Sequence, residues 1–321
     1  MKEIKITSNE AGQRLDKLLG KYLNQAPKSF IYKMLRKKNI LLNGKKASGN
    51  EMLSLDDDVT LFLADDTIAK FSQIKVETVH TDLDIIYEDA HILLINKPSG
   101  MLSQKACDTD VSLVEYLISY LLETKQITTE ELRSFKPSVC NRLDRNTSGL
   151  VTAGKSLEGL QDLSWMLKER KLEKYYYCFI QGELSKSQYL KGYLQKNPKT
   201  NKVTISQTES MDGQWIETSY APVWWNQGIT LLEVELITGK THQIRAHLAS
   251  IGHPIIGDYK YGNQKINLKF KEEFGIKSQL LHAYRMVFPT CTGALASLSG
   301  QTFTAPLPKE FQQICKVKRG L

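Results

Sequence analysis

Hydrophobic positions in the first part of this chain recur at helical spacing. Between residues 12 and 23, three leucines and a tyrosine fall on one helical stripe with lysines opposite, which predicts an amphipathic helix. A second helix is predicted after Pro27, with Ser29 as its N-cap and an apolar face formed by Ile31, Met34 and Leu35. Its last turn is crowded with basic side chains, which suit the C-terminal end of a helix: Lys33, Arg36, Lys37 and Lys38.

The spacing then changes to that of short strands. A strand beginning at Ile40 enters an Asn43-Gly44 turn, which is a strong hairpin signal, and another apolar run covers 59–63. Two short helices and a small hairpin sheet predict an α+β domain over residues 11–63. Residues 64–79 show no clear period and are interpreted as a linker.

The remaining residues, 80–317, are predicted to form a larger domain. Two β-rich runs lie within 84–97, and helices are expected at 111–122 and 157–172. Further strands are expected at 175–182, 203–205, 218–223 and 230–236. Hairpin strands with occasional helices predict the α+β class, because a doubly wound fold would alternate strands and helices strictly.

Composition and charge narrow the class of protein. The chain has 321 residues, 41% of them hydrophobic, without a run of about 20 apolar residues that would span a membrane or an apolar leader behind the first residues. Five scattered cysteines without a CxxC pair favour reduced thiols in a cytoplasmic protein over a disulfide framework or a zinc site. Residues 11–50 hold ten Lys/Arg against one acid, whereas 51–90 hold two lysines against eleven acids. The basic block suggests a face for a polyanion, although a solvated helix face would look the same.

The segment Asn141–Leu150 carries candidate chemistry. Asp144 lies between Arg142 and Arg145 and is followed by Thr147, Ser148 and Gly149, residue types that mark a sharp turn. We expect the two arginines to keep the carboxylate ionised at neutral pH, which suits a nucleophile better than a proton donor. The residues alone leave open that Asp144 only caps a turn.

Two further segments supply possible partners. In the strand at 175–182, Tyr176, Cys178 and Ile180 share one face, which either packs in the core or opens onto a cleft. Near residue 241 a strand gives way to a helix that carries Arg245 close to His242. His242 and His247 are five residues apart, not the four that place two ligands on one helical face, so we predict no metal site.

These three segments, in this order, resemble the RluA-type family of pseudouridine synthases. The resemblance covers about 80–317 and includes Tyr87-Glu-Asp, Asn96-Lys-Pro98 and Leu281-His-Ala283. Residues 11–63 resemble the alpha-L RNA-binding domain first described in a ribosomal protein, through Arg14-Leu-Asp16, the basic cluster at 33–38 and Ile40–Gly44. The chain departs from the family in one place, since Asn141 stands where a histidine is usual. An asparagine cannot titrate there.

The resemblance implies an RNA-uridine isomerase with a mainly antiparallel sheet and flanking helices. It implies Asp144 as the essential aspartate, Arg245 as its basic partner, and Tyr176 as a tyrosine that stacks on the base and helps to remove the carbon-5 proton. No cofactor or metal is expected, because isomerisation gains no atoms. Candidate RNA-binding residues are Arg14, Lys33, Arg36, Lys37, Lys46, Arg142, Lys199 and Lys202.

The basic N-terminal domain favours ribosomal RNA of the large subunit as the target, and a site within one chain favours a monomer. A solvated loop is an equal alternative for Lys199 and Lys202. Two other functions compete: a non-catalytic RNA-binding or ribosome-assembly factor, and a hydrolase. A hydrolase needs a second carboxylate, for which only Asp258 is available.

Overall fold

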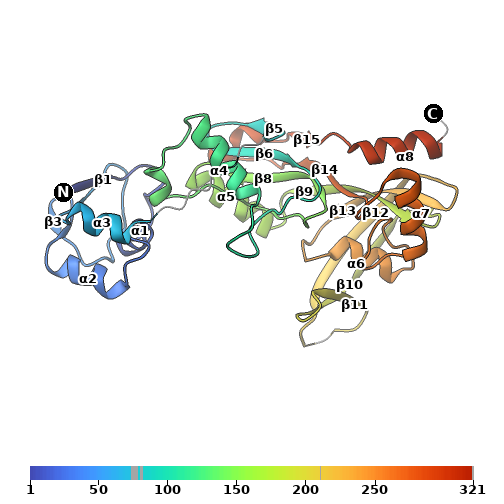
Figure 1. The fold of residues 1–321 in the computed structure, drawn as a ribbon, viewed down its shortest axis with the longest axis horizontal. Helices are drawn as coiled ribbons and strands as arrows, with labels where there is room; N and C mark the ends of the chain where they lie inside the picture. Colours follow the sequence, from blue (N-terminus) through green and yellow to red (C-terminus); the bar gives the residue numbers. More distant parts are fainter. Residues whose placement is uncertain (74–78, 80–81, 210, 320–321) are drawn as a thin grey trace.

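The computed structural model describes residues 1–73, 79, 82–209 and 211–319, which form a small N-terminal unit beside a large sheet domain (Figure 1). The small unit has an antiparallel sheet in the order β1 (Lys2–Lys5), β4 (Asp58–Leu61), β2 (Ile40–Leu42), β3 (Lys45–Lys46). Its helices are α1 (Leu15–Tyr22), α2 (Lys28–Arg36) and α3 (Asp65–Phe71). Asn43 and Gly44 both have positive φ, 51° and 70°, as the predicted tight hairpin turn requires.

The small unit extends beyond the predicted range of 11–63 in both directions. Strand β1 precedes residue 11, and Ile6 after it is buried in the core of this unit. The prediction of a linker from residue 64 is wrong for α3, which buries Ile68 in the same core. Its single buried apolar residue was too weak a periodic signal to reveal a helix. Residues 74–78 of the predicted linker lie outside the described part.

Helix α2 also begins differently from the prediction. Its N-cap is Pro27, which makes no side-chain hydrogen bond, and Ser29 is already inside the helix. Proline, whose φ is fixed near the value seen here, is accepted at a helix start because the first N–H groups lack partners anyway. The cap was therefore assigned two residues too late.

The large sheet has eleven strands and is mainly antiparallel, with one parallel pair between β8 and β14. Its main path runs in the order β11 (Lys202–Ser206), β10 (Gln188–Asn197), β12 (Gln214–Asn226), β13 (Ile229–Leu236), β9 (Glu173–Gln181), β14 (Leu281–Val287), β8 (Ser148–Gly154), β6 (Ile92–Lys97), β5 (Ile85–Glu88). Short strands β7 (Ser138–Val139) and β15 (Thr302–Thr304) pair with β8 and β14. The predicted α+β class is confirmed.

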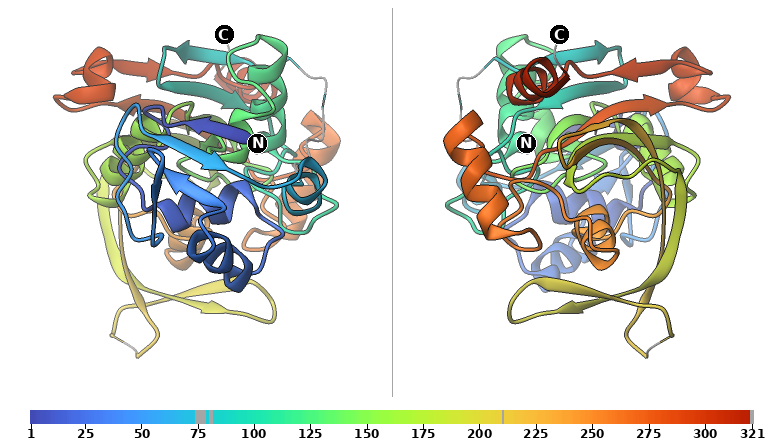
Figure 2. Two further views of the ribbon diagram at one scale, coloured as in Figure 1. Left: turned by 90° about the vertical axis from the view of Figure 1, so that its left-hand side faces the viewer. Right: turned by 90° about the vertical axis from the view of Figure 1, so that its right-hand side faces the viewer.

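Helices cover both faces of this sheet. One face packs against α4 (Leu113–Glu123) and α6 (Gln243–Ser250) in a single core. The other packs against α5 (Leu157–Lys168), α7 (Gln264–Phe274) and α8 (Lys309–Arg319). Strand β9 alternates between the layers as predicted, with Tyr176, Cys178 and Ile180 on the α6 side and Phe179 on the other. The β10–β11 hairpin forms the lower edge of the molecule in Figures 1 and 2.

Five strands of the large sheet were not predicted: β7, β8, β10, β14 and β15. Ser148 and Gly149 were interpreted as part of a turn, but the turn lies at Arg145–Asn146 and Ser148 begins β8, which is buried throughout. A strand covered on both faces has no polar alternation to reveal it. Gly149 is required in β8 because a Cβ there would lie 2.1 Å from the carbonyl oxygen of Ala283 on β14.

Hydrogen bonds join the small unit to the sheet domain. Tyr22 donates to the carboxylate of Glu130 (2.7 Å), and the buried Glu10 accepts from Ser134 (2.6 Å). The side chain of Asn9 accepts from the backbone N–H of Leu157 at the start of α5 (2.9 Å). These contacts fix how the basic surface of the small unit is presented relative to the sheet. In the part of the chain described, no helix is long and apolar enough to cross a membrane.

His282 should make the stability of the sheet depend on pH. It is fully buried, its Nδ1 is hydrogen-bonded to Ser148 Oγ (2.8 Å), and burial lowers its pKa to about 4. The unfolded chain, with an ordinary histidine pKa near 6.5, then binds more protons than the folded chain as pH falls. Stability from this residue is therefore complete above pH 6.5 and is lost towards pH 4, by about 3 kcal/mol in total.

Urea unfolding of the wild type and His282→Asn at pH 7, 5.5 and 4.5 measures this contribution. Asparagine keeps a polar atom near the position of Nδ1 but does not titrate. The variant is expected to be less stable at pH 7 and to lose less stability on acidification. Parallel curves for the two proteins would contradict the assignment.

Candidate active site

The loop that carries Asp144 connects β7 to β8 and is held by its backbone. Leu143 is buried, and its N–H and C=O both bond to the hydroxyl of Ser103 at 3.0 Å. The N–H of Thr147 donates to the C=O of Asp144 (3.0 Å), which closes the turn. With the backbone fixed on both sides, the Asp144 side chain projects from a defined point.

Lys97, which the sequence indicated only as part of the Asn96-Lys-Pro98 segment of the resemblance, supports the same loop. Its buried ammonium group donates to the carbonyls of Pro98 (2.9 Å), Met101 (2.8 Å) and Arg145 (3.1 Å). Burial lowers the pKa of Lys97 to about 8, against the attraction of Asp144. The cation therefore fastens the turn next to Asp144.

Asn141, which departs from the family pattern, has a structural role. Its side-chain oxygen accepts from both the N–H (2.7 Å) and the hydroxyl (2.9 Å) of Thr152 on β8. Its amide donates to the C=O of Leu150 at 3.4 Å. An amide makes these bonds without titrating, so asparagine suits this position.

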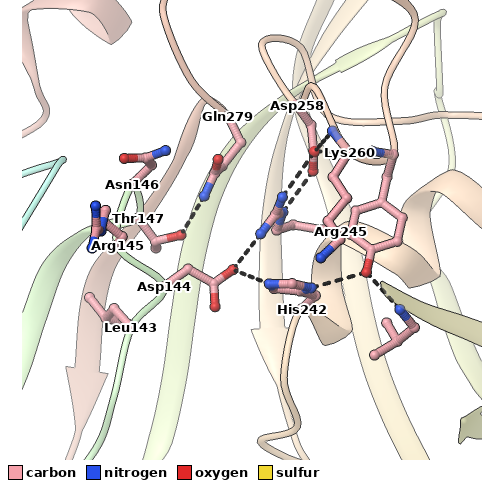
Figure 3. Close-up of polar contacts among 12 residues, drawn as sticks. Leu143, Asp144, Arg145, Asn146, Thr147, His242, Arg245, Asp258, Lys260 and Gln279 are labelled. Atoms are coloured by element: carbon pink, nitrogen blue, oxygen red, sulfur yellow. Dashed lines mark hydrogen bonds and ion pairs between the residues drawn. The ribbon is translucent and has the colours of Figure 1, made fainter. Parts of the chain in front are cut away.

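Asp144 is paired with Arg245, as predicted, and not with its sequence neighbours. Arg245 Nη1 lies 2.7 Å from Asp144 Oδ2, whereas Arg142 and Arg145 form no ion pair with Asp144 among the described residues (Figure 3). The expectation that the two flanking arginines hold the carboxylate is therefore wrong. Asp144 keeps 27% of its side-chain surface exposed, and its Oδ1 has no described partner.

Arg245 is fixed by a second carboxylate that the sequence did not assign to it. Asp258, fully buried, binds Nε (2.7 Å) and Nη2 (3.0 Å) of Arg245. Burial opposes the charge on Arg245, but hydrogen bonding and attraction from Asp258 and Asp144 outweigh it and raise the pKa of the guanidinium. Because Asp258 lies behind the arginine without access to solvent, it is not placed to activate water as a hydrolase would require.

His242 is a site residue for which sequence reasoning gave no role. It precedes α6 with a left-handed backbone (φ 53°), and the buried Gln243 side chain secures the turn through Thr238 and Thr218. Nε2 of His242 lies 3.9 Å from Asp144 Oδ2, and Nδ1 is hydrogen-bonded to the Tyr261 hydroxyl (3.0 Å). Burial lowers the pKa of His242, so the ring is neutral at physiological pH. The feature that marks His242 as a site residue is its unusual backbone conformation beside a carboxylate. The spacing of residues along the sequence does not reveal that conformation.

Tyr176 lies in the wall of a cavity beside Asp144. The cavity has a volume of about 60 Å³ and is also lined by Arg142, Arg245, His242, Lys240 and Leu281. It is far smaller than the roughly 300–1,000 Å³ of pockets that enclose drug-sized ligands, so it accepts one small group. Burial, followed by the negative charge of Asp144, raises the pKa of Tyr176, which keeps its phenol neutral. A neutral phenol fits stacking better than the proton removal implied by the resemblance.

The other predicted RNA-binding residues lie in two places. Lys33 and Arg36 on α2, Lys37 after it and Lys46 on β3 are exposed on the small unit, and within the described residues they have no ion-pair partner. Arg14 differs, because it is bound to Asp16 (2.9 Å) and Asn50 (2.6 Å) in the same unit. Lys199 and Lys202 lie at the β10–β11 hairpin, with Lys202 Nζ 5.7 Å from the ring of Tyr261. The described ranges contain no group of three or more metal-ligating side chains.

Comparison with known proteins agrees with this geometry. Residues 91–250 match the model of the RNA pseudouridylate synthase family. The chain is 32% identical over 302 residues to ribosomal large subunit pseudouridine synthase C of Buchnera aphidicola, covering 89% of this chain and 88% of that protein. It is 30% identical to the Vibrio vulnificus protein of that name, covering 89% and 87%. The chain belongs to the RNA pseudouridylate synthase family.

A solved structure supports the fold. Human RNA pseudouridylate synthase domain containing 4 superposes with a TM-score of 0.56 at 19% identity, covering 72% of this chain and 91% of that one. The family match and the relatives confirm the resemblance of residues 80–317 to pseudouridine synthases, and with it the reaction class, isomerisation of uridine in RNA. The resemblance of residues 11–63 to an alpha-L RNA-binding domain stays a prediction. The family assignment does not test the roles of individual residues.

Asp258→Asn should damage both stability and activity. The substitution removes the charge that neutralises a guanidinium whose side chain is only 9% exposed, so we expect unfolding free energy to fall by about 3 kcal/mol. The freed arginine should also hold Asp144 less well and slow isomerisation. Denaturant unfolding and single-turnover isomerisation measure the two effects.

Glu233→Gln is the matched control. It breaks another carboxylate–arginine pair, with Arg285 (3.1 Å), but one in which both side chains are more than a quarter exposed, and glutamine can still accept the hydrogen bond that the Tyr284 hydroxyl donates to Glu233. Its effect on stability should be below about 1 kcal/mol and its isomerisation rate should stay at the wild-type level. If both variants isomerise uridine at the wild-type rate, Asp258 does not position Arg245.

Proposed function

We propose that this protein isomerises specific uridines of large-subunit ribosomal RNA, with Asp144 as the reacting carboxylate. The observation that carries the proposal is the ion pair between Asp144 and a fixed Arg245 at the edge of a small cavity walled by Tyr176. The choice of RNA is supported by the names of the relatives, which are enzymes of the ribosomal large subunit, and by the basic small unit. We propose a monomer acting in the cytoplasm.

The reaction needs two things from the protein: a group that acts on the substrate as the glycosidic bond breaks, and a site that holds the base as it turns. The bond between N1 of the base and C1′ of the ribose breaks, the base turns, and a bond forms between C5 and C1′. A proton then leaves C5 and N1 gains one, so the product has the atoms of the substrate. The uridine must leave its helix or loop for its base to enter the cavity, at a cost of a few kcal/mol.

The carboxylate of Asp144 meets the first requirement. Its Oδ2 is held by Arg245, while Oδ1 has no partner among the described residues, and Asp144 lines the cavity that a base would enter. An oriented carboxylate can attack the sugar or the base, or stabilise or deprotonate the sugar as the bond breaks. Arg245 serves all these routes by holding the carboxylate in place.

Tyr176 and Arg142 meet the second requirement, which is to hold the turned base. Tyr176 stacks as a neutral aromatic ring, worth about 1–3 kcal/mol per base in proteins that bind single strands. Arg142 is exposed at the cavity and can pair with a phosphate next to the flipped nucleotide. Lys240 adds a second cation at the cavity wall.

Asp144→Asn should abolish pseudouridine formation and leave the fold and RNA affinity intact. The substitution keeps the shape of the side chain but removes the charge that every proposed route uses. In cells that lack the gene, a copy encoding the wild type should restore specific pseudouridines in large-subunit ribosomal RNA, and the variant should restore none. Purified variant and wild type should unfold at the same temperature within a few degrees.

Asp108→Asn is the control for this test. It removes an exposed carboxylate from the loop before α4 and should restore every site. An active Asp144→Asn protein would eliminate Asp144 as the reacting group. If the restored pseudouridines are confined to transfer RNA, the ribosomal substrate is rejected. If the wild type restores no pseudouridine, the non-catalytic RNA-binding factor is favoured.

The basic surface of the small unit should give affinity with little sequence preference. Replacing Lys33, Arg36 and Lys37 together by alanine should weaken RNA binding about tenfold or more at physiological salt, because each lost phosphate contact lowers the salt slope by about 0.7–0.9. Filter binding or fluorescence anisotropy at several salt concentrations measures both quantities. The rate at saturating RNA should change little.

Helix α7 offers a matched control with equal charge loss. Its exposed lysines are Lys265, Lys269 and Lys271. Their replacement by alanine should leave the affinity and the salt slope close to the wild-type values. If the two triple variants lose RNA affinity equally, the loss reflects net charge in general and not a specific RNA-binding surface on the small unit.

A further inference from the structure

Residues Asp258, Tyr259, Lys260 and Tyr261 form a loop between α6 and α7 that contacts two parts of the molecule at once. We call it the bridging loop. On one side it contacts Arg245 and His242, and on the other the β10–β11 hairpin. From the sequence, Asp258 of this segment was considered only as a second carboxylate for a hydrolase.

The contacts on the site side are short and buried. Asp258 holds Arg245 through two hydrogen bonds and accepts the backbone N–H groups of Lys260 (2.9 Å) and Tyr261 (3.1 Å). The ring of Tyr261 lies 5.3 Å from the guanidinium carbon of Arg245, and its hydroxyl is hydrogen-bonded to His242. The loop is thus joined to both residues that approach Asp144 from α6.

The contacts on the hairpin side use the same residues. The N–H of Val203 on β11 donates to the Tyr261 hydroxyl (2.9 Å), and the same hydroxyl is hydrogen-bonded to His242 beside Asp144. Lys260 Nζ donates to the carbonyls of Thr200 (3.2 Å) and Asn201 in the hairpin turn. One phenol group therefore connects the hairpin backbone to the histidine beside Asp144.

The hairpin is the part of this region that RNA can reach. Strand β11 is the edge of the large sheet, and residues 195–202 around the turn are exposed. Lys199 and Lys202 lie in this hairpin. Lys202 Nζ lies over the ring of Tyr261, at the end of the chain of contacts that is farther from Asp144. The inner side of β11 packs through Val203 against Ala246, the neighbour of Arg245.

We infer that Tyr261 is a positioning residue through which the β10–β11 hairpin, when it holds RNA, orients His242, Arg245 and the carboxylate of Asp144. Contact with RNA at the hairpin then raises the rate of the chemical step as well as the affinity. The inference rests on the proposed function, since it concerns the same RNA and the same carboxylate. The β10–β11 hairpin and the Asp144 carboxylate would then be energetically coupled, and double-mutant cycles measure such coupling directly.

The test uses Tyr261→Phe in the full chain, with RNA that carries a uridine that the wild type modifies. The variant keeps the ring and loses only the hydroxyl that joins Val203 to His242. At saturating RNA, the single-turnover rate should fall about 3- to 10-fold, the loss that corresponds to one hydrogen bond, with the dissociation constant nearly unchanged. Tyr259→Phe is the control, because Tyr259 is 51% exposed and its hydroxyl has no partner among the described residues.

Lys199→Ala supplies the second arm of the cycle. In the wild-type background it should raise the dissociation constant and also lower the rate at saturating RNA. In the Tyr261→Phe background it should raise the dissociation constant only, because the link to Asp144 is already broken. A role of Tyr261 in stability alone would leave the effect of Lys199→Ala on the rate equal in both backgrounds.

The outcomes separate this inference from the proposed function. If the wild type isomerises no uridine, the proposed function fails first. If the wild type is active and Tyr261→Phe matches it at saturating RNA, or the two substitutions act independently on the rate, the coupling is overturned. Should Tyr261→Phe fold poorly at the assay temperature, the cycle is repeated at a lower temperature at which denaturant unfolding shows the variant to be folded, with the same expected dependence on Lys199.

Discussion

The site depends on one buried cation between two carboxylates. The guanidinium of Arg245 is almost without solvent, and such a charge is stable in a protein only when it is fully paired. Asp258 uses two nitrogens of the fork and leaves Nη1 for Asp144. Because the guanidinium is planar, fixing two of its nitrogens also fixes the direction of the third. The orientation of the partly exposed Asp144 carboxylate is thus set by Asp258, which is fully buried.

The elements around this pair are arranged to bring three distant segments together. The turn with Asp144 is anchored by Lys97 and Ser103, and β8 after it lies against β14, where Gly149 allows the close approach. His242 turns the chain into α6 through a left-handed residue, which carries an energetic cost that the surrounding hydrogen bonds outweigh. The left-handed residue thus places Nε2 of the imidazole 3.9 Å from Asp144 Oδ2.

Local patterns in the sequence predicted the parts of this structure whose signals are local. The alternation in β9, the Asn43-Gly44 hairpin and the apolar face of α4 follow from side chains that neighbour one another. Strands β8 and β14 escaped because both of their faces are covered, and α3 escaped because a single buried residue shows no period. The ionic partner of Asp144 was inferred through the family resemblance, since charge at adjacent positions pointed to Arg142 and Arg145 instead. Contacts such as Asp258 with Arg245 and Tyr261 with Val203 depend on tertiary structure, and the spacing of residues along the chain does not predict them.

Under the proposed function, the basic surface of the small unit and the β10–β11 hairpin would affect RNA differently, because they are joined to the site differently. The small unit is docked through Glu10, Tyr22 and Asn9 to segments on the side of the sheet domain that carries α5 and the turn near residue 130, and none of these contacts reaches Asp144. Under the proposed function, RNA binding there would add phosphate contacts and hold the substrate in register without altering the Asp144 carboxylate. The β10–β11 hairpin, by contrast, shares Tyr261 and the bridging loop with the residues that orient it. Under the proposed function, an RNA that touches only the small unit would bind without reacting well, whereas one that also engages the hairpin would react. Selection of a uridine would then require a folded RNA long enough to reach both surfaces, which is the kind of substrate that a large ribosomal RNA provides.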